Sequence, residues 1–430
     1  MTADDLGADA DAAMTATPAP GGASAAPERG GPLSALESRS FLLFWCTISV
    51  SLTGVWVRIT AQGWLVFELT NDPFLLGVVS FCGAAPVLIA SPIAGALLDR
   101  VDRRRMLLAV QVVVASAMLV LATLVATDTV RVWHIMAIAA IAGAASGFDW
   151  PARLSLVPSL VAPHQLQSAV ALNAAAFNAS RIIGPAIAGF LLGAVGAAAC
   201  FYLNALMYIP FVVALATITV DRAGAAAKTY RDSPLRTLLD GYRYIWRTPA
   251  IRGLLSVDIV PLMFGISYFT LAPAVAREVL GLGARGLGVL QAANGAGYLL
   301  GTVAVAALVR AQNRGRIVVV GVGGYAVALV GFALSRDAIL SVVLIFGLGL
   351  VVAIYGTLND TLVQTLVDDG YRGRVLSVYS MLWGLTPIGG LEAGFLANHV
   401  GVQAALAVNG VVILCYVPVL LRFTPVARIQ

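Results

Sequence analysis

Long apolar runs separated by short polar segments repeat along most of the chain. The first two run from residue 41 to 68 and from 74 to 98, with only a few polar positions between them. A helix needs about 20 apolar residues to cross a bilayer, and each run is long enough. Because lipid cannot satisfy open backbone groups, helices are the expected form. The pattern therefore predicts an all-α membrane protein.

Twelve such runs can be placed, and an even number returns the chain to the side on which it began. Their predicted bounds are 41–68, 74–98, 106–127, 131–150, 166–193, 198–220, 251–276, 286–309, 316–335, 338–364, 374–398 and 402–422. Short stretches repeat between the two groups of six: Gly189-Phe190-Leu191 returns as Gly394-Phe395-Leu396. The repeat favours two pseudo-symmetric six-helix bundles.

The segments outside the runs complete the predicted organisation. Residues 1–36 are rich in Ala, Gly and Pro and lack the pattern of a signal peptide, so we expect a disordered cytoplasmic tail. Ser233-Pro234 in the central polar segment is typical of a helix start. An amphipathic helix on the inner membrane surface is expected there, and a plain helical linker is the alternative. The expected parts are a tail (1–36), a first bundle (37–220), a linker (221–250), a second bundle (251–423) and a final tail (424–430).

Composition supports the membrane location and argues against other classes of protein. Of the 430 residues, 59% are hydrophobic and 11% are charged, whereas an ordinary soluble domain has about a quarter charged residues. The net charge is +5, but no basic face alternates with aromatic residues, so we expect no nucleic-acid partner. The four cysteines and three histidines do not cluster, and the sequence has neither a P-loop nor a nucleophile–His–acid set. We expect no metal, no cofactor and no enzyme activity.

The basic residues are distributed unevenly between the two sides of the predicted spans. Most of the 27 Lys and Arg residues fall in the segments on the same side as the N-terminus. Cytoplasmic loops carry such an excess. The chain is therefore predicted to be a multi-pass membrane protein with both termini cytoplasmic.

The densest charge cluster separates the second and third runs. It reads GALLDRVDRRR from residue 95 to 105. The pattern Gly95-x-x-x-Asp99-Arg100-x-x-Arg103-Arg104 resembles the signature of the major facilitator superfamily, with Asp102 in place of the second glycine. The resemblance implies a secondary transporter with twelve helices in two bundles around a central cavity.

Three further stretches resemble one branch of that superfamily, the exporters similar to enterobactin and macrolide efflux proteins, which are called transmembrane secretion effectors. They are "SRSFLLFW" from Ser38, "DWPARLSLVPSLV" from Asp149 and "ALNAAAFNASRIIGPAIAGFLL" from Ala171. The resemblance covers roughly residues 38–421. It implies export across the bacterial inner (cytoplasmic) membrane, and it does not identify the substrate.

The resemblance also gives the charged loop a role as a conformational latch. In the family the aspartate that matches Asp99 contacts the start of helix eleven and holds the two halves together on the cytoplasmic side. Arg103 matches a basic position of the family, and Asp149 is its expected partner. The predicted latch comprises Gly95, Asp99, Arg100, Arg103, Arg104 and Asp149. The alternative is that the arginines only set the topology.

Ionisable residues inside the predicted spans are costly and are therefore candidates for the substrate or proton site. They are Arg58, Arg181, Asp258 and Glu392. Glu392, in a run of small residues, is the leading proton carrier and Asp258 the second. A fixed ion pair of Glu392 with Arg58 or Arg181 is the alternative. Gly184, Pro185 and Gly189 follow Arg181 and are similar to the antiporter motif of helix five, which implies a hinge.

These observations predict proton-coupled export of an amphiphilic small molecule, such as a drug, a secondary metabolite or a siderophore, by alternating access. The expected partners are this substrate, protons and the lipid bilayer, and the protein is expected to be a monomer. Movement of a lipid or lysophospholipid between leaflets, or solute import, is one alternative on the same scaffold. A membrane receptor that transports nothing is the other.

Overall fold

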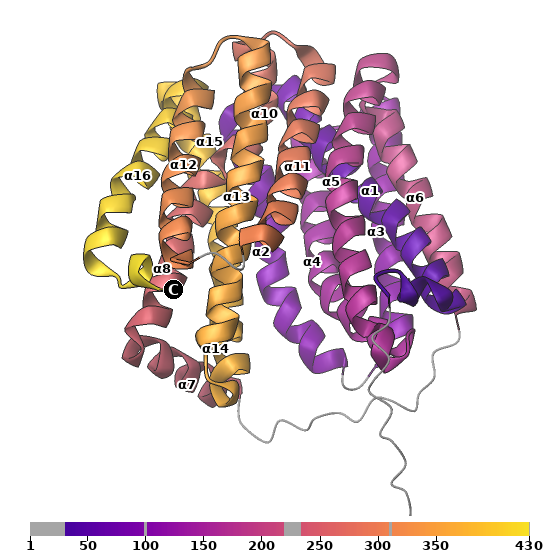
Figure 1. Cartoon of the computed structure of the whole chain (residues 1–430). Coiled ribbons are helices and arrows are strands. Elements are labelled where there is room, and N and C mark those ends of the chain that lie inside the picture. The colour runs from indigo at the N-terminus through magenta and orange to yellow at the C-terminus, as the bar shows by residue number, and fades with distance from the viewer. Residues whose placement is uncertain (1–30, 99–100, 219–233, 309–311, 430) are drawn as a thin grey trace, which may run out of the picture.

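The computed structural model describes residues 31–98, 101–218, 234–308 and 312–429 (Figure 1). Most of the predicted N-terminal tail and the first part of the predicted linker lie outside these four ranges. Asp99 and Arg100, two residues of the predicted latch, also lie outside them. Their role in the latch therefore stays a prediction.

Long helices follow the apolar runs, and they divide into two halves that lie side by side in Figure 1. The first half contains η1 (Ser34–Glu37), α1 (Arg39–Thr70), α2 (Pro73–Leu98), α3 (Arg103–Ala126), α4 (Val132–Leu156), η2 (Val157–Ser159), η3 (Pro163–Gln165), α5 (Leu166–Val195) and α6 (Ala197–Thr217). After α7 (Pro234–Arg247), the second half contains α8 (Pro249–Val260), η5 (Pro261–Gly265), α9 (Ser267–Thr270), α10 (Ala272–Ala274), η6 (Val275–Val279), α11 (Gly283–Leu308), α12 (Arg314–Leu334), α13 (Ala338–Leu366), α14 (Asp369–Met381), η7 (Leu382–Leu385), α15 (Thr386–Val400), α16 (Val402–Phe423) and η8 (Val426–Arg428).

Eleven segments of the described chain are helical, long and apolar enough to cross a membrane. The remaining predicted span, 374–398, is divided into α14, the 3-10 helix η7 and α15, so neither part is long enough alone. When this interrupted segment is counted with the other eleven, the predicted all-α architecture of two six-helix bundles is confirmed.

The seventh predicted span, 251–276, is also not one regular helix. Its α-helical part ends at Val260, and a π-helical turn follows from Pro261 to Gly265. Pro261 has no backbone N–H to donate, which removes a helical hydrogen bond at this point. A second π-helical turn runs from Val275 to Val279. Such turns are frequent at functional sites, and residues of the segment between them line a cavity between the halves.

The helix predicted in the linker is present as α7, and it packs on the start of α14. The Tyr244 ring stacks on that of Tyr371 with centroids 4.5 Å apart, and its hydroxyl donates to Asp368 over 3.0 Å. Leu239 and Trp246 are exposed on α7, as expected for a helix that faces a membrane surface. The linker helix therefore belongs structurally to the second half.

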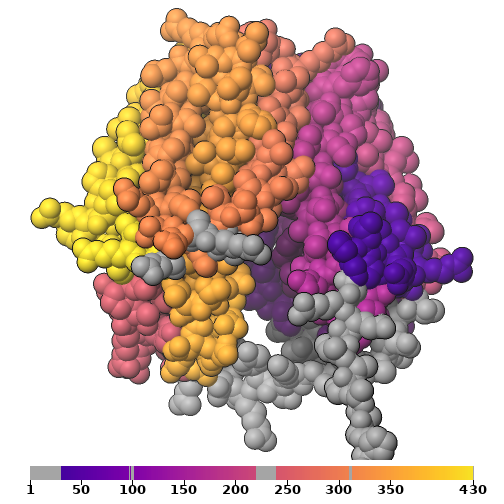
Figure 2. Space-filling model, in the orientation of Figure 1, coloured from indigo at the N-terminus to yellow at the C-terminus, as the bar shows by residue number. Residues whose placement is uncertain are grey.

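The two halves meet tightly at the end of the molecule opposite α7, where α5 crosses α11 and α2 crosses α15. A Cβ atom on Gly189 would lie 2.7 Å from Gly288 Cα, and one on Gly77 would lie 2.5 Å from the Gly390 carbonyl oxygen. Small residues allow helix backbones to approach this closely. At the α7 end, Figure 2 shows the molecule hollowed between the halves. The structure is thus closed at one end and open at the other.

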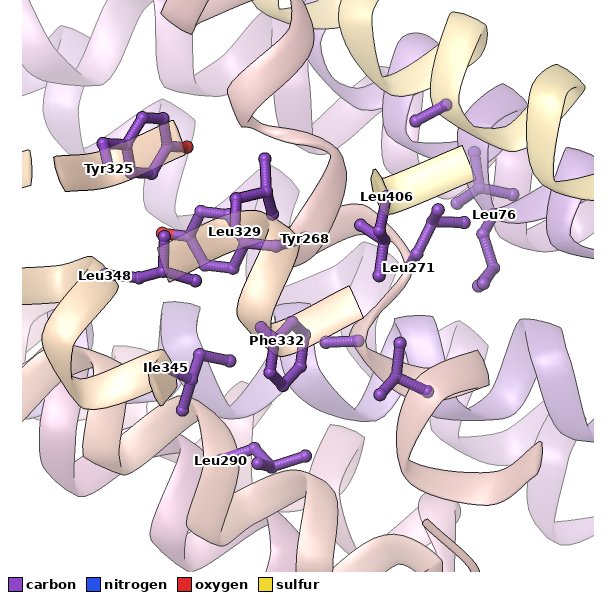
Figure 3. Close-up of a cluster of buried hydrophobic side chains, with 14 of the residues drawn as sticks. Leu76, Tyr268, Leu271, Leu290, Tyr325, Leu329, Phe332, Ile345, Leu348 and Leu406 are labelled. Carbon is purple, nitrogen blue, oxygen red and sulfur yellow. The ribbon is translucent and has the colours of Figure 1, made fainter. Parts of the chain in front are cut away.

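The largest apolar core joins the halves. It contains residues of α1–α6 together with residues of α8–α16. Figure 3 shows part of it, in which Leu76 of α2 joins Leu271 and Leu406 of the second half. Beside this core, the two bundles enclose the cavity.

Candidate functional site

A cavity of about 340 Å³ lies between the two halves. Its wall takes residues from α1, α2 and α4 of the first half, and from segment 266–273, α11, η7 and α15 of the second. Arg58 lies 19 residues into α1, which places it roughly 28 Å along that helix at 1.5 Å per residue. The cavity therefore sits beyond the middle of the bundle, near the closed end.

The wall of the cavity is mostly apolar and carries a single charge. Its apolar residues include Leu76, Val79, Phe269 and Trp383. Its polar side chains are those of Gln62, Ser80, Ser146, Thr270, Gln291 and Thr386. Arg58 is the charged residue of the wall, and no Asp or Glu of the described chain belongs to it. An apolar cavity with a few polar groups is the usual form of a small-molecule site.

Arg58 has no acidic partner among the described residues. One terminal nitrogen, Nη1, donates to Gln62 Oε1 over 3.1 Å, one helical turn away. Its Nε is buried and has no hydrogen-bond partner in the same part of the chain. The alternative ion pair of Glu392 with Arg58 is not formed in this structure. The cavity thus contains a guanidinium with unused donor capacity.

Arg181, expected at the same cavity, instead connects the two halves. Its Nη2 donates to Asn294 Oδ1 over 3.0 Å, and the guanidinium lies 4.3 Å from the centre of the Tyr298 ring. It also lies 5.6 Å from the Trp56 ring. Asn294 and Tyr298 belong to α11, whereas Arg181 belongs to α5. Arg181 is absent from the cavity wall and has no carboxylate partner within the described ranges, contrary to the structural alternative considered for it.

Glu392 is half-buried on α15 and accepts a hydrogen bond from Asn409 Nδ2 of α16 over 3.1 Å. Its surroundings are as tight as its small neighbours predict, since a Cβ atom on Gly394 would lie 2.8 Å from the Pro73 carbonyl oxygen. Neither Arg58 nor Arg181 reaches it as an ion-pair partner. These contacts do not test the role as proton carrier that the sequence analysis gave to Glu392, and the cluster of Asp258 described next replaces it as the proposed proton site.

Asp258 belongs to a different cluster, nearer the α7 end. It is 7% exposed, and its Oδ2 accepts from Asn359 Nδ2 over 2.7 Å and from the Tyr379 hydroxyl over 2.5 Å. The same hydroxyl lies 2.6 Å from Asp360 Oδ1. Asp360 is exposed, so the cluster leads from water to a buried carboxyl group. No sequence signal connects these residues, because they lie on α8, α13 and α14.

The cluster contains more acceptors than one hydroxyl proton can serve. Tyr379 has one O–H proton and lies within hydrogen-bond distance of two carboxyl oxygens. It can donate to one of them only. The other contact is a hydrogen bond only when that carboxyl group carries a proton and donates to the phenolic oxygen. The geometry therefore fits one added proton shared between Asp258 and Asp360.

The expected pairing of Arg103 with Asp149 is wrong for this structure. Asp149 Oδ2 lies 2.5 Å from Arg153 Nε, one turn further along α4, and its Oδ1 accepts from Gln111 over 2.6 Å. Arg103 Nη1 donates to the Ser155 carbonyl over 3.0 Å. The spacing of four residues between Asp149 and Arg153 is itself a helical pairing signal. The sequence analysis chose Arg103 as the partner of Asp149 instead, because Arg103 matches a basic position of the family.

Two further residues of the predicted latch lie in the described chain. Arg104 donates to the carbonyl groups of Leu215 and Ala216, which end α6. Arginine at a helix C-terminus satisfies carbonyls that have no partner within the helix. Gly95 is exposed, and a Cβ atom there would meet no described atom within 4 Å. In this state Arg103 and Arg104 tie helices of the first half together.

The predicted hinge residues lie in close helix contacts. Helix α5 continues without a break through Pro185. A Cβ atom on Gly184 would lie 2.8 Å from the Thr53 carbonyl of α1, and Gly189 forms the contact with Gly288 of α11. These glycines therefore permit packing in the observed state. Whether α5 bends there during a transport cycle stays a prediction.

Known proteins resemble this chain over most of its length. It is 25% identical to the staphyloferrin A transporter of Staphylococcus aureus, over 88% of this chain and 92% of the relative. It is 28% identical to the multidrug efflux pump Tap of Mycolicibacterium fortuitum, over 81% and 87%. It is 22% identical to macrolide efflux protein A of Streptococcus pyogenes, over 87% and 93%.

Solved structures share the fold. A variant of the nucleoside transporter NupG superposes with a TM-score of 0.74 at 12% identity, over 89% of this chain and all of that one. A D-xylose–proton symporter superposes with a TM-score of 0.71 at 14% identity, over 90% and 98%. The sequence profile described as "Transmembrane secretion effector" matches residues 30–428. The chain therefore belongs to the transmembrane secretion effector family of the major facilitator superfamily.

Proposed function

We propose that this protein is a secondary transporter that exports an amphiphilic small molecule from the cytoplasm in exchange for protons. The observation that carries the proposal is the cavity whose wall is shared by both halves. A site between two bundles is where transporters of this architecture bind their substrates. The efflux proteins among its relatives support export rather than import.

The observed state is the inward-facing one under this proposal. We place the α7 end, where basic residues gather, and both termini on the cytoplasmic side of the inner membrane. Release to the other side then requires that the α5–α11 and α2–α15 contacts separate. The hydrogen bond between Arg181 and Asn294 joins α5 to α11, and it would have to open in the same step. The latch assigned to Asp99 would hold the α7 end closed once that end has moved together.

Protons would enter through the cluster of Asp258, Tyr379 and Asp360. Asp360 is exposed and can exchange a proton with water, whereas Asp258 is buried. The Tyr379 hydroxyl connects the two, so a proton taken from one side can be passed to the other across a single side chain. Tight packing of the halves at the α7 end would remove Asp360 from cytoplasmic water. A proton site that changes its access with the conformation is what coupling requires.

The test is transport by the purified protein in liposomes with an imposed pH gradient. A fluorescent amphiphile serves as the transported compound. Its concentration inside the liposomes should exceed that outside, and a protonophore should abolish the difference. Flux that is the same with and without a gradient would favour movement of lipid or passive solute transport. Absence of any flux, in protein that is folded and inserted, would favour the receptor alternative.

A further inference from the structure

Arg58 differs in its surroundings from Arg153 and Arg181, two other arginines of the described helices. Arg153 has the carboxylate of Asp149, and Arg181 has Asn294 and two aromatic rings. Among the described residues, Arg58 has one amide oxygen, that of Gln62, and a buried Nε without a partner. Arg58 as a whole is half-buried, and a cation that is partly removed from water without a counter-charge is costly. The wall, as far as the chain is described, offers no acid to reduce that cost.

We propose that the exported molecule supplies the missing counter-charge: it carries one oxyanion, such as a carboxylate or sulfonate, that binds Arg58. This inference rests on the proposed function only in taking the cavity as the transport site. The planar guanidinium fork matches two oxygens of such a group, and charge-assisted hydrogen bonds of this kind are the strong ones. Gln62, which already holds the guanidinium, fixes its position at the wall.

The rest of the wall determines the remainder of the molecule. Phe269 and Trp383 come from the second half and Leu76 and Val79 from the first, so an apolar body would contact both halves at once. The volume of about 340 Å³ is at the lower end of the range for drug-sized ligands, roughly 300–1,000 Å³. The ligand class is therefore a compact apolar or aromatic body with a single anionic group.

The same features disfavour cations in this cavity. A cationic ligand would place a second positive charge beside Arg58, with no acidic residue among the described residues of the wall to compensate either of them. Like charges in a site of low dielectric repel strongly. A neutral ligand would leave Arg58 as it is. The predicted order of affinity is anion, then neutral compound, then cation.

The experiment measures binding, without any gradient, to the full-length protein in lipid nanodiscs. The probes share one apolar body and differ in charge: 2-naphthylacetate, 2-(2-naphthyl)ethanol and 2-(2-naphthyl)ethylammonium. In the wild type, the anion should bind about tenfold or more tighter than the alcohol, the effect expected of a charge-assisted hydrogen bond. In Arg58→Gln this ratio should fall to about one, with the affinity for the alcohol unchanged.

Two further variants keep the test decisive. Arg58→Lys retains the charge and should retain part of the preference, so it replaces Arg58→Gln if the latter does not fold. Arg105→Gln removes an exposed arginine outside the cavity wall and should leave the ratio unchanged. A wild-type preference for the ammonium probe, an unchanged ratio in Arg58→Gln, or no binding of any probe overturns the proposal. Because no gradient is applied, loss of proton coupling would leave this result intact.

Discussion

The two halves place an aspartate near the end of corresponding helices, and they treat it differently. In the first half, Asp149 near the end of α4 has Arg153 beside it and accepts from Gln111. In the second half, Asp360 near the end of α13 has no basic partner in the described chain, and it meets Asp258 through Tyr379 instead. Asp149 is thus neutralised by an arginine, whereas Asp360, at the corresponding position of the second half, is joined to a second acid.

The difference assigns separate physical tasks to the halves. A buried ion pair is stable as a unit and costs several kcal/mol to break by removing one partner. Two carboxyl groups that share one hydroxyl bind protons as a coupled pair instead. In the first half the pair lies within α4, and the hydrogen bond from Gln111 joins it to α3. Under the proposed function, the second half carries the group whose protonation changes during transport.

The largest effect is expected at the buried acid of the second half. Asp258→Asn removes the proton-binding oxygen while its amide oxygen can still accept from Asn359 and Tyr379. Uphill accumulation on a pH gradient should fall to the background rate, and binding of substrate should persist. Transport by purified Asp258→Asn in liposomes measures this. Wild-type accumulation by the variant would remove Asp258 from the proton path.

The next effect concerns the stability of the first half. Arg153→Met removes the cation and leaves the Asp149 carboxylate without its partner, which should lower the free energy of unfolding by about 3–5 kcal/mol. Thermal unfolding in detergent measures the loss. The double variant Arg153→Met with Asp149→Leu should recover much of it, because no unpaired charge then remains. Equal stability of Arg153→Met and the wild type would mean that the pair contributes nothing.

A smaller effect is expected when the connection between the two acids is removed. Tyr379→Phe keeps the ring and deletes the hydroxyl, so Asp258 and Asp360 lose their shared hydrogen bonds. The rate of proton-driven transport should fall about tenfold, which corresponds to about 1.4 kcal/mol, the size of one hydrogen bond. Initial rates at several pH values give the comparison. A rate within experimental error of the wild type would show that protons reach Asp258 by another route.

The smallest effect is expected at Glu392. Glu392→Gln keeps an oxygen that can accept from Asn409, and no arginine is stranded by the change. We expect the transport rate to stay within about twofold of the wild type. The free energy of unfolding should stay within about 0.5 kcal/mol, as for a substitution that breaks no buried contact. The same liposome assay and melting experiment apply. Loss of uphill transport in this variant, with binding retained, would transfer the proton site from the second half's cluster to α15.

Much of the fold could be predicted from the spacing of apolar residues. The first predicted run, 41–68, corresponds to α1 at Arg39–Thr70, because a bilayer sets a common length for every span. The interruptions were not predictable in the same way. The π-helical turn at Pro261–Gly265 and the 3-10 helix at Leu382–Leu385 interrupt spans seven and eleven, yet the residues of both interruptions are apolar. Hydropathy reports which side chains prefer an apolar environment, and it contains no information on the backbone conformation within a run.

The site was predictable as a set of residues and not as a set of contacts. The cost of charge in lipid selected Arg58, Arg181 and Asp258 from the sequence. It could not show that Arg58 faces the cavity and Arg181 faces α11, because both depend on how the halves pack. The contact of Tyr379 with two acids could not be predicted for another reason. Tyr379 is one of 12 tyrosines in the sequence. Its hydroxyl contacts two carboxyl groups only because α8, α13 and α14 pack together.

The most direct test of the contrast between the halves is the infrared absorption of protonated carboxylic acid in the purified protein, followed as pH changes. The account predicts a carbonyl band that titrates in the wild type and in Glu392→Gln, and that is lost or strongly reduced in Asp258→Asn. A band that is unchanged in Asp258→Asn, or that disappears in Glu392→Gln instead, would contradict the assignment of the exchangeable proton to the second half's paired acids.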